Sequence, residues 1–125
     1  MPDQVATSTE SPTFSPTVFI TREKPGVYDV VVDTLAPNSC YRVGTYQQEL
    51  PPGIEISIPE YEHLVCEAIY TGGMNRMCLM YIKPMRWDAQ DLKIGEGKTH
   101  LVVHILIGNA VVGSKIVKLP SGVPA

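Results

Sequence analysis

The chain has 125 residues, which is enough for one domain with short tails. Apolar residues make up 44% of it and charged residues only 18%, so a hydrophobic core is expected. Its 11 prolines and 10 glycines favour many turns over long helices. The net charge of −3 gives no reason to expect nucleic acid or an anionic membrane surface as a partner.

Composition divides the chain into one domain and two tails. Residues 1–16 are rich in Ser, Thr and Pro and predict a flexible tail, because they cannot bury enough surface to offset the entropy lost on ordering. Residues 121–125 predict a second, short tail, which leaves 17–120 as a single β-domain. The chain as given shows no signal peptide and no transmembrane segment, and its compartment stays open.

Short β-type runs separated by turn residues occupy most of 17–120. Alternating or β-branched segments of this kind, with Pro and Gly between them, indicate an all-β sandwich or barrel of about seven or eight strands. The segment 86–97 is polar and predicts at most one helical turn, at 88–92. The expected strands are 17–22, 27–33, 40–46, 54–58, 62–70, 77–82, 98–107 and 110–119.

The last two runs predict a β-hairpin. Gly108 and Asn109 form a good two-residue loop, because Gly tolerates the positive φ that such loops need. A regular register then places Ile105 opposite Val112, and it pairs Val103 with Ser114 and Leu101 with Ile116. One face of this hairpin is largely apolar and is expected to lie on the core.

The segment 35–41, Leu-Ala-Pro-Asn-Ser-Cys-Tyr, resembles the Leu-x-Pro-x-Thr-x-Tyr corner of fibronectin type III domains, with Ser39 at the position of the usual Thr. The resemblance implies that Leu35 and Tyr41 pack where the chain crosses between two sheets. It covers seven residues and comes earlier in the chain than in that family. Two interpretations remain: the same corner in a different strand order, or a Pro-Asn turn before a strand. With the strand pattern, it favours an immunoglobulin-like antiparallel β-sandwich.

The three cysteines, Cys40, Cys66 and Cys78, allow either three reduced thiols or one disulfide with a free thiol. If a disulfide forms, Cys40 with Cys78 is the favoured pair, and it would be structural. Cys66 alternates with Leu64 and Ala68, which is typical of a core position where a thiol is inert.

A methionine-rich segment, 74–85, suggests a soft-metal site. Thioether and thiolate ligands select Cu(I), so Met74, Met77, Cys78 and Met80 are the candidate ligands of a small copper carrier. The spacing disfavours the site, because Met77 and Met80 point to opposite faces of a strand. Met as an adaptable core filler explains the same residues. No metal and no cofactor is therefore expected.

The histidines and cysteines provide no recognisable catalytic site. His100 and His104 would lie about 13 Å apart along an extended strand, too far to bind one metal ion together. His63 would join either of them only if the fold happened to bring its strand alongside. No nucleophile elbow or other local catalytic signature is present, so the chain is not expected to be an enzyme.

Surface binding is the function that remains. Tyr46 and Tyr61 lie beside predicted loops, where an aromatic side chain can anchor a partner. Unpaired strand edges provide a second route, including self-association with another copy. The sequence therefore predicts a non-catalytic binding or structural module that acts through protein–protein contacts, with the soft-metal carrier as the alternative.

Overall fold

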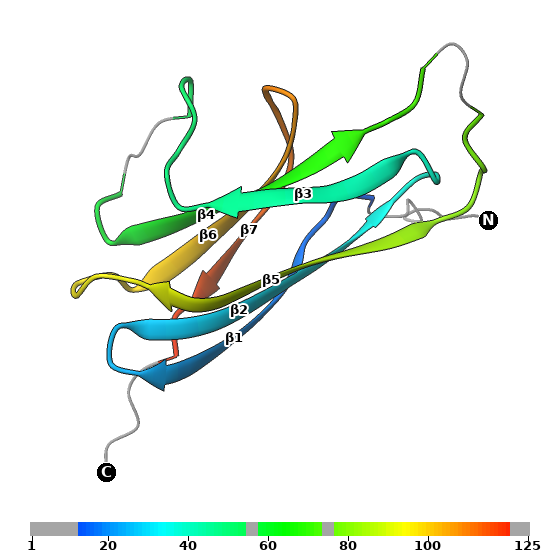
Figure 1. Cartoon of the computed structure of the whole chain (residues 1–125). Helices are drawn as coiled ribbons and strands as arrows, with labels where there is room; N and C mark the ends of the chain where they lie inside the picture. Colours follow the sequence, from blue (N-terminus) through cyan, green and yellow to red (C-terminus); the bar gives the residue numbers. More distant parts are fainter. Residues whose placement is uncertain (1–12, 55–57, 74–76, 121–125) are drawn as a thin grey trace, which may run out of the picture.

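The computed structural model describes residues 13–54, 58–73 and 77–120 (Figure 1). The described part of the chain is all-β, and none of it forms a helix long and apolar enough to cross a membrane. Its strands are β1 (Thr17–Lys24), β2 (Val27–Ala36), β3 (Tyr41–Gln47), β4 (Tyr61–Tyr70), β5 (Lys83–Lys93), β6 (His100–Ile107) and β7 (Ala110–Lys118).

The strands form two sheets that face each other, which confirms the predicted sandwich (Figure 1). Sheet A has the order β1-β2-β5 and sheet B has the order β3-β4-β6-β7. Every pair is antiparallel except β4 with β6, which is parallel. Parallel neighbours need a crossover connection, and here β5, a strand of the other sheet, provides it.

Alternating side chains of both sheets fill the core between them. Val30 and Val32 of β2 and Leu64 and Cys66 of β4 have no measurable exposure. Trp87 of β5 is the largest fully buried side chain, and its Nε1 donates a hydrogen bond of 3.1 Å to the Glu67 carbonyl of the opposite sheet. An indole buried with its N–H satisfied stabilises the contact between the sheets.

Strand β5 corrects the expectation of a polar segment with a helical turn at 88–92. Met85, Trp87 and Ala89 alternate on the core face of β5, and Leu92 continues that face after an irregularity in the ladder. Asp91 lies at the irregularity with a φ of 56°. This extra residue shifts the alternation by one, so the two-residue period is broken in the sequence although the strand continues.

One other expected strand differs from the structure, and a second lies partly outside the described residues. Residues 77–82 were expected to form a buried strand, but they lie outside β5 and are largely exposed. A continuous apolar run is ambiguous because it lacks a period that identifies its buried face. The expected strand 54–58 falls partly on residues 55–57, which lie outside the described residues.

Residues 14–16 were predicted to belong to the flexible N-terminal tail, but they pack against the domain. Phe14 belongs to the core, with 8% of its surface exposed, and its N–H donates to the Leu35 carbonyl at 2.8 Å. The Thr34 hydroxyl also donates to the Ser15 carbonyl at 3.0 Å. One aromatic anchor and two hydrogen bonds thus hold 14–16 against sheet A. Residues 1–12 and 121–125 of the predicted tails lie outside the described residues.

The β6–β7 hairpin has the predicted two-residue loop, with Ile107 opposite Ala110, but its register changes beyond Val111. Ile105 faces Gly113 instead of Val112, Val103 faces Lys115, and Leu101 faces Val117. A bulge inserts one extra residue into β7, and that insertion moves each later pairing by one position.

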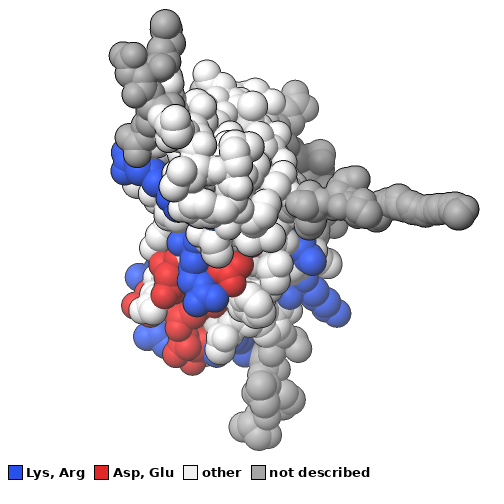
Figure 2. Space-filling view, turned by 90° about the vertical axis from the view of Figure 1, so that its right-hand side faces the viewer, with Lys and Arg blue, Asp and Glu red and all other residues white. Residues whose placement is uncertain are grey.

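The connections between strands divide between the two ends of the sandwich (Figure 1). The β2–β3, β4–β5 and β6–β7 connections lie at one end, which we call the disulfide end. The β1–β2, β3–β4 and β5–β6 connections lie at the other end, which we call the opposite end. Figure 2 looks onto the disulfide end and shows a broad upper surface with few charged residues.

Candidate functional site: a disulfide-braced apolar loop

The β2–β3 turn is the first part of the candidate site, because it positions Cys40. Asn38 accepts a hydrogen bond of 2.9 Å from the Cys40 N–H through its side-chain Oδ1, which closes a tight Asx turn. The turn carries the chain from sheet A to sheet B, as a corner of the kind that segment 35–41 resembles would do. Tyr41 packs between Phe14 and Tyr70, with ring centres 5.1 and 5.0 Å away. The turn therefore presents Cys40 at a fixed position on the core side.

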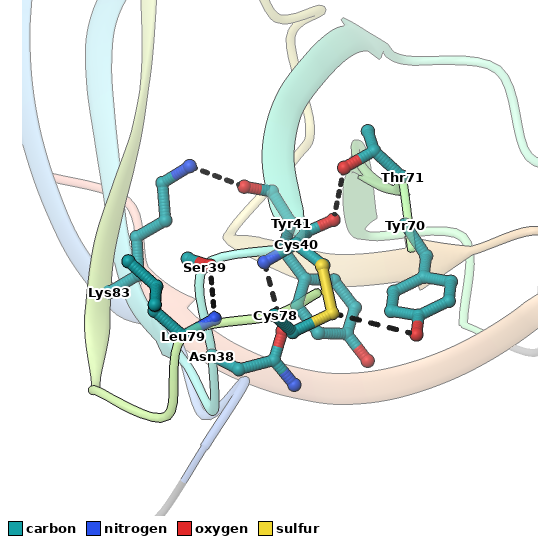
Figure 3. The surroundings of a disulfide bond; sticks show 9 residues. All are labelled: Asn38, Ser39, Cys40, Tyr41, Tyr70, Thr71, Cys78, Leu79 and Lys83. Atoms are coloured by element: carbon teal, nitrogen blue, oxygen red, sulfur yellow. Dashed lines mark hydrogen bonds between the residues drawn. A yellow bond between two sulfur atoms is a disulfide. The ribbon is translucent and has the colours of Figure 1, made fainter. Parts of the chain in front are cut away.

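A disulfide joins Cys40 to Cys78, with 5.3 Å between the two Cα atoms (Figure 3). This is the pair favoured from the sequence, and it leaves Cys66 as a buried free thiol. Burial raises the pKa of the Cys66 thiol to about 12, so the reactive thiolate is scarce at neutral pH. The disulfide thus fixes the long β4–β5 connection to the turn between the two sheets.

Hydrogen bonds hold the same connection on both sides of the disulfide (Figure 3). Ser39 and Leu79 exchange two bonds: the Ser39 N–H donates to the Leu79 carbonyl at 3.0 Å, and the Leu79 N–H donates to the Ser39 hydroxyl at 2.8 Å. The Thr71 N–H and hydroxyl both donate to the Cys40 carbonyl, at 2.6 and 2.7 Å. The Lys83 ammonium donates to the Tyr41 carbonyl at 2.6 Å.

The braced segment presents apolar side chains to solvent. We call residues 77–82 the apolar loop, and it contains no charged residue. Met77 is 84% exposed and Met80 is 82% exposed, while Leu79, Tyr81 and Ile82 are each about half exposed. Tyr70 and Leu35 add exposed apolar surface at this end of the molecule. Singly exposed apolar residues are common on proteins, whereas a group of them on one constrained loop is unusual and makes the loop the candidate site.

The predicted soft-metal ligands do not assemble in the described structure. Cys78 is in the disulfide and has no thiolate to offer a metal. Met77 and Met80 point into solvent, and Met74 lies outside the described residues. In 13–54, 58–73 and 77–120, no group of three or more His, Cys, Asp and Glu side chains has the geometry to hold a metal ion.

The two tyrosines expected to contact a partner lie apart. Tyr46 is 40% exposed on edge strand β3 and pairs with Cys66, on the core-facing side of sheet B. Tyr61 begins β4 with the opposite side-chain direction, and its ring contacts His100 at 5.1 Å. Tyr46 lies opposite Cys66, which is five residues along β4 from Tyr61. About 17 Å of extended strand therefore separates the two tyrosine positions. They do not form one surface.

A chain of polar side chains crosses the outer face of sheet B. The parallel pairing of β4 with β6 places His63 Nδ1 3.1 Å from His104 Nε2, and His104 Nδ1 lies 3.1 Å from the Ser114 hydroxyl of β7. The two rings are within 6° of parallel, with centres 5.3 Å apart, which fits rings side by side joined by one N–H···N bond. Sequence reasoning missed this contact because it depends on an unpredicted strand pairing.

The two histidines of this polar chain are partly desolvated, and this changes their titration. Burial lowers the pKa of both imidazoles, and the neighbouring His63 lowers the pKa of His104 further. Ser114 lies within the ladder of β7, directly opposite His104.

Sequence reasoning also missed the exposure of the apolar loop. The available signal was the apolar run 77–82, which has no charge, contains Cys78 and follows shortly after Gly72 and Gly73. Comparisons of the chain with protein-family models, with curated proteins and with solved structures find no match. The assignment of function therefore depends on the geometry of this chain alone.

Proposed function

We propose that the chain is a non-catalytic, immunoglobulin-like binding module that recognises a protein partner through the apolar loop 77–82. The observation that carries the proposal is the exposure of Met77 and Met80, above 80% each, on a segment that a disulfide and several hydrogen bonds hold in place. Exposing such side chains to water is unfavourable, and a partner that covers them would remove that cost.

The chemistry of the loop suits a protein partner with an apolar groove. Methionine side chains are flexible and polarizable, so they adapt to irregular apolar surfaces. Tyrosine adds a rigid ring with a polar tip, which is enriched at interfaces. The brace lowers the entropy lost when the loop docks, because the backbone is already constrained. Together, these features supply a preformed apolar centre for an interface.

The test compares three forms of the full chain as bait in a pull-down from its native source. The first is the unmodified chain, and the second is Met77→Ser with Met80→Ser. The third, Ile116→Ser, is the matched control, because it removes an exposed apolar side chain (53% exposed) from β7 on sheet B. A protein that the first and third forms retain and the double variant loses is then purified and titrated against all three.

We expect the double variant to weaken binding of the purified partner about thirtyfold or more, as for interface hot spots, and the control to leave it within about twofold. Equal binding by all three forms would refute the proposal. A concentration-dependent dimer lost only in the double variant would identify the partner as a second copy. Loop-dependent retention of Cu(I) without any protein partner would instead favour the soft-metal carrier, through the Met77 and Met80 thioethers.

A further inference from the structure

Arg22 lies on the core-facing side of sheet A, at the opposite end of the sandwich from the disulfide. Val18, Ile20 and Arg22 alternate along β1, and the first two pack against the core. Arg22 pairs with Tyr28, itself 8% exposed, just before a bulge in the β1–β2 ladder. Residues at this inner face are expected to be apolar, so a guanidinium here requires a reason.

The Arg22 Nε is buried without a hydrogen-bond partner, and it is the only such side-chain nitrogen or oxygen found in the described part of the chain. Leaving a buried charged donor unsatisfied costs free energy, because the group has lost its water and gained no acceptor. Native structures satisfy nearly all such groups, so each exception requires an explanation. The same burial keeps a ligand oxygen away from Nε itself, so a ligand would contact Arg22 through the part of its side chain that lines two cavities at this end.

Two adjoining cavities meet at Arg22, Tyr28 and Lys98, which line both of them. We call these cavities together the anion pocket. One, of about 290 Å³, extends along the loop Gly95-Glu96-Gly97, and the other, of about 240 Å³, extends toward Lys118 and Leu119. The charged lining is three basic residues, Arg22, Lys98 and Lys118, against one acid, Glu96. Among the residues that line the cavities, basic side chains therefore outnumber acidic ones.

Hydrogen bonds between chain segments fix the rim of the anion pocket. The Ile94 N–H donates to the Gly26 carbonyl at 2.9 Å, which ties the β5–β6 connection to the β1–β2 turn. The Leu119 N–H donates to the Thr99 carbonyl, also at 2.9 Å. Lys98 donates to the Pro59 carbonyl at 2.8 Å and lies 3.8 Å from a Glu62 oxygen, so its position is held from the β3–β4 connection. The cavity is thus formed without a ligand.

We propose that the anion pocket binds the oxyanion group, carboxylate or phosphate, of a small ligand, with Arg22 as the principal contact. A guanidinium offers paired N–H groups in a fork that matches two oxygens of such a group, and Arg22 lines both cavities. Tyr28, Ile94 and Leu119 provide apolar walls for the rest of the ligand. The site is separate from the apolar loop, at the other end of the sandwich (Figure 1).

The experiment follows the Arg22 Nε–H signal in NMR spectra of the ¹⁵N-labelled full chain near neutral pH. Inorganic phosphate and acetate are titrated separately, and sodium chloride at equal ionic strength gives the baseline. We expect phosphate or acetate to move this signal and the Gly26 and Gly97 amide signals saturably in the millimolar range. Arg22→Gln should weaken that binding about tenfold or more, and Arg22→Lys less, because lysine keeps the charge but loses the fork.

The control is Arg42→Gln, which removes an exposed arginine from β3 and should leave binding unchanged. Lys118→Gln, at the exposed rim, should weaken binding about threefold and keeps the test decisive if Arg22→Gln does not fold. Sedimentation with phosphatidylcholine–phosphatidylglycerol vesicles separates two sources: Arg22-dependent pelleting assigns a lipid phosphate, and anion binding without pelleting assigns a free oxyanion. An Nε–H signal that both anions leave unmoved, or binding unchanged in Arg22→Gln, would overturn the proposal.

Discussion

At the scale of single residues, His104 shows how burial and a neighbouring histidine together lower the pKa of a side chain. Its ring is 8% exposed and has a partner at each nitrogen, His63 on one side and Ser114 on the other. One proton between two imidazole nitrogens satisfies both, whereas a proton on each facing nitrogen places two donors against each other. The folded state therefore disfavours full protonation of the pair.

This pair predicts a stability that depends on pH. Because burial lowers the pKa of His63 and His104 below 6.5, the unfolded chain takes up protons first as the pH falls. For His63, Glu62 opposes this shift and Lys98 adds to it. The free energy of unfolding should therefore be highest above the unfolded pKa of 6.5 and should decrease as the pH falls through it toward the folded values.

Urea denaturation at a series of pH values measures this effect. His63→Gln leaves fewer titrating groups in the pair and should flatten the dependence between neutral and mildly acidic pH. His100→Gln removes a histidine from the same sheet but not from the pair, and it should keep the wild-type profile. A His63→Gln profile as steep as that of the unmodified chain would show that the pair is not responsible.

The environment of a single residue could be predicted from the sequence where it follows from the local alternation of apolar side chains. Cys66 lies in the core, between Leu64 and Ala68, as its pattern indicates. The contact of His63 with His104 was not accessible, because 41 residues separate them and no local pattern specifies that their strands pair in parallel. Arg22 was visible as a member of an alternating run, but its burial depends on Tyr28 and on loops from both sheets.

At the scale of elements, Gly113 shows how β7 accommodates the segment before β1. A Cβ atom at Gly113 would overlap with the Phe14 carbonyl oxygen, so the approach of the two backbones requires glycine. Phe14 then inserts its ring into the core beside Tyr41. This small residue thus allows the N-terminal segment to close one side of the sandwich.

Gly113→Ala should consequently destabilise the protein by about 1–3 kcal/mol, the usual range for an added methyl group in a packed site. The matched control is Gly73→Ala, where an added Cβ meets nothing within 4 Å. Chemical denaturation followed by Trp87 fluorescence gives both values. Equal stability of the two variants would mean that Phe14 does not pack on β7 in solution.

Elements were predicted correctly where one apolar period ran unbroken, as in β2 and β4, and were wrong where it was interrupted. The irregularity at Asp91 hid the core face of β5. The apolar loop had the opposite problem, since its hydrophobic residues suggested burial but the disulfide holds them at the surface. Apolar composition alone does not distinguish a core strand from a binding loop.

At the scale of the whole molecule, the Cys40–Cys78 disulfide links positions 38 residues apart, with β3 and β4 between them in the chain. Closing a loop of that length lowers the entropy of the unfolded chain, which by the chain-entropy relation stabilises the fold by about 4 kcal/mol. The topology itself was not predictable. Two sheets follow from the strand patterns, but the order β3-β4-β6-β7 with one parallel pair does not.

Cys40→Ser with Cys78→Ser should therefore lower the free energy of unfolding by about 4 kcal/mol, within the usual range of 2–5 kcal/mol for a native disulfide. Urea denaturation of the unmodified chain with and without a reductant should give the same difference. Limited proteolysis should show faster cleavage within 77–82 in the double variant. A loss well under 1 kcal/mol would contradict the constraint proposed for this loop.

The placement of the apolar loop and the anion pocket at opposite ends has one consequence for how the module can be used. Strands of ten residues or so separate them, a span of about 30 Å. Two ligands of ordinary size fit at that separation without touching. On the two proposals made above, the domain would act as a spacer that holds a protein partner at one tip and a small oxyanion ligand at the other.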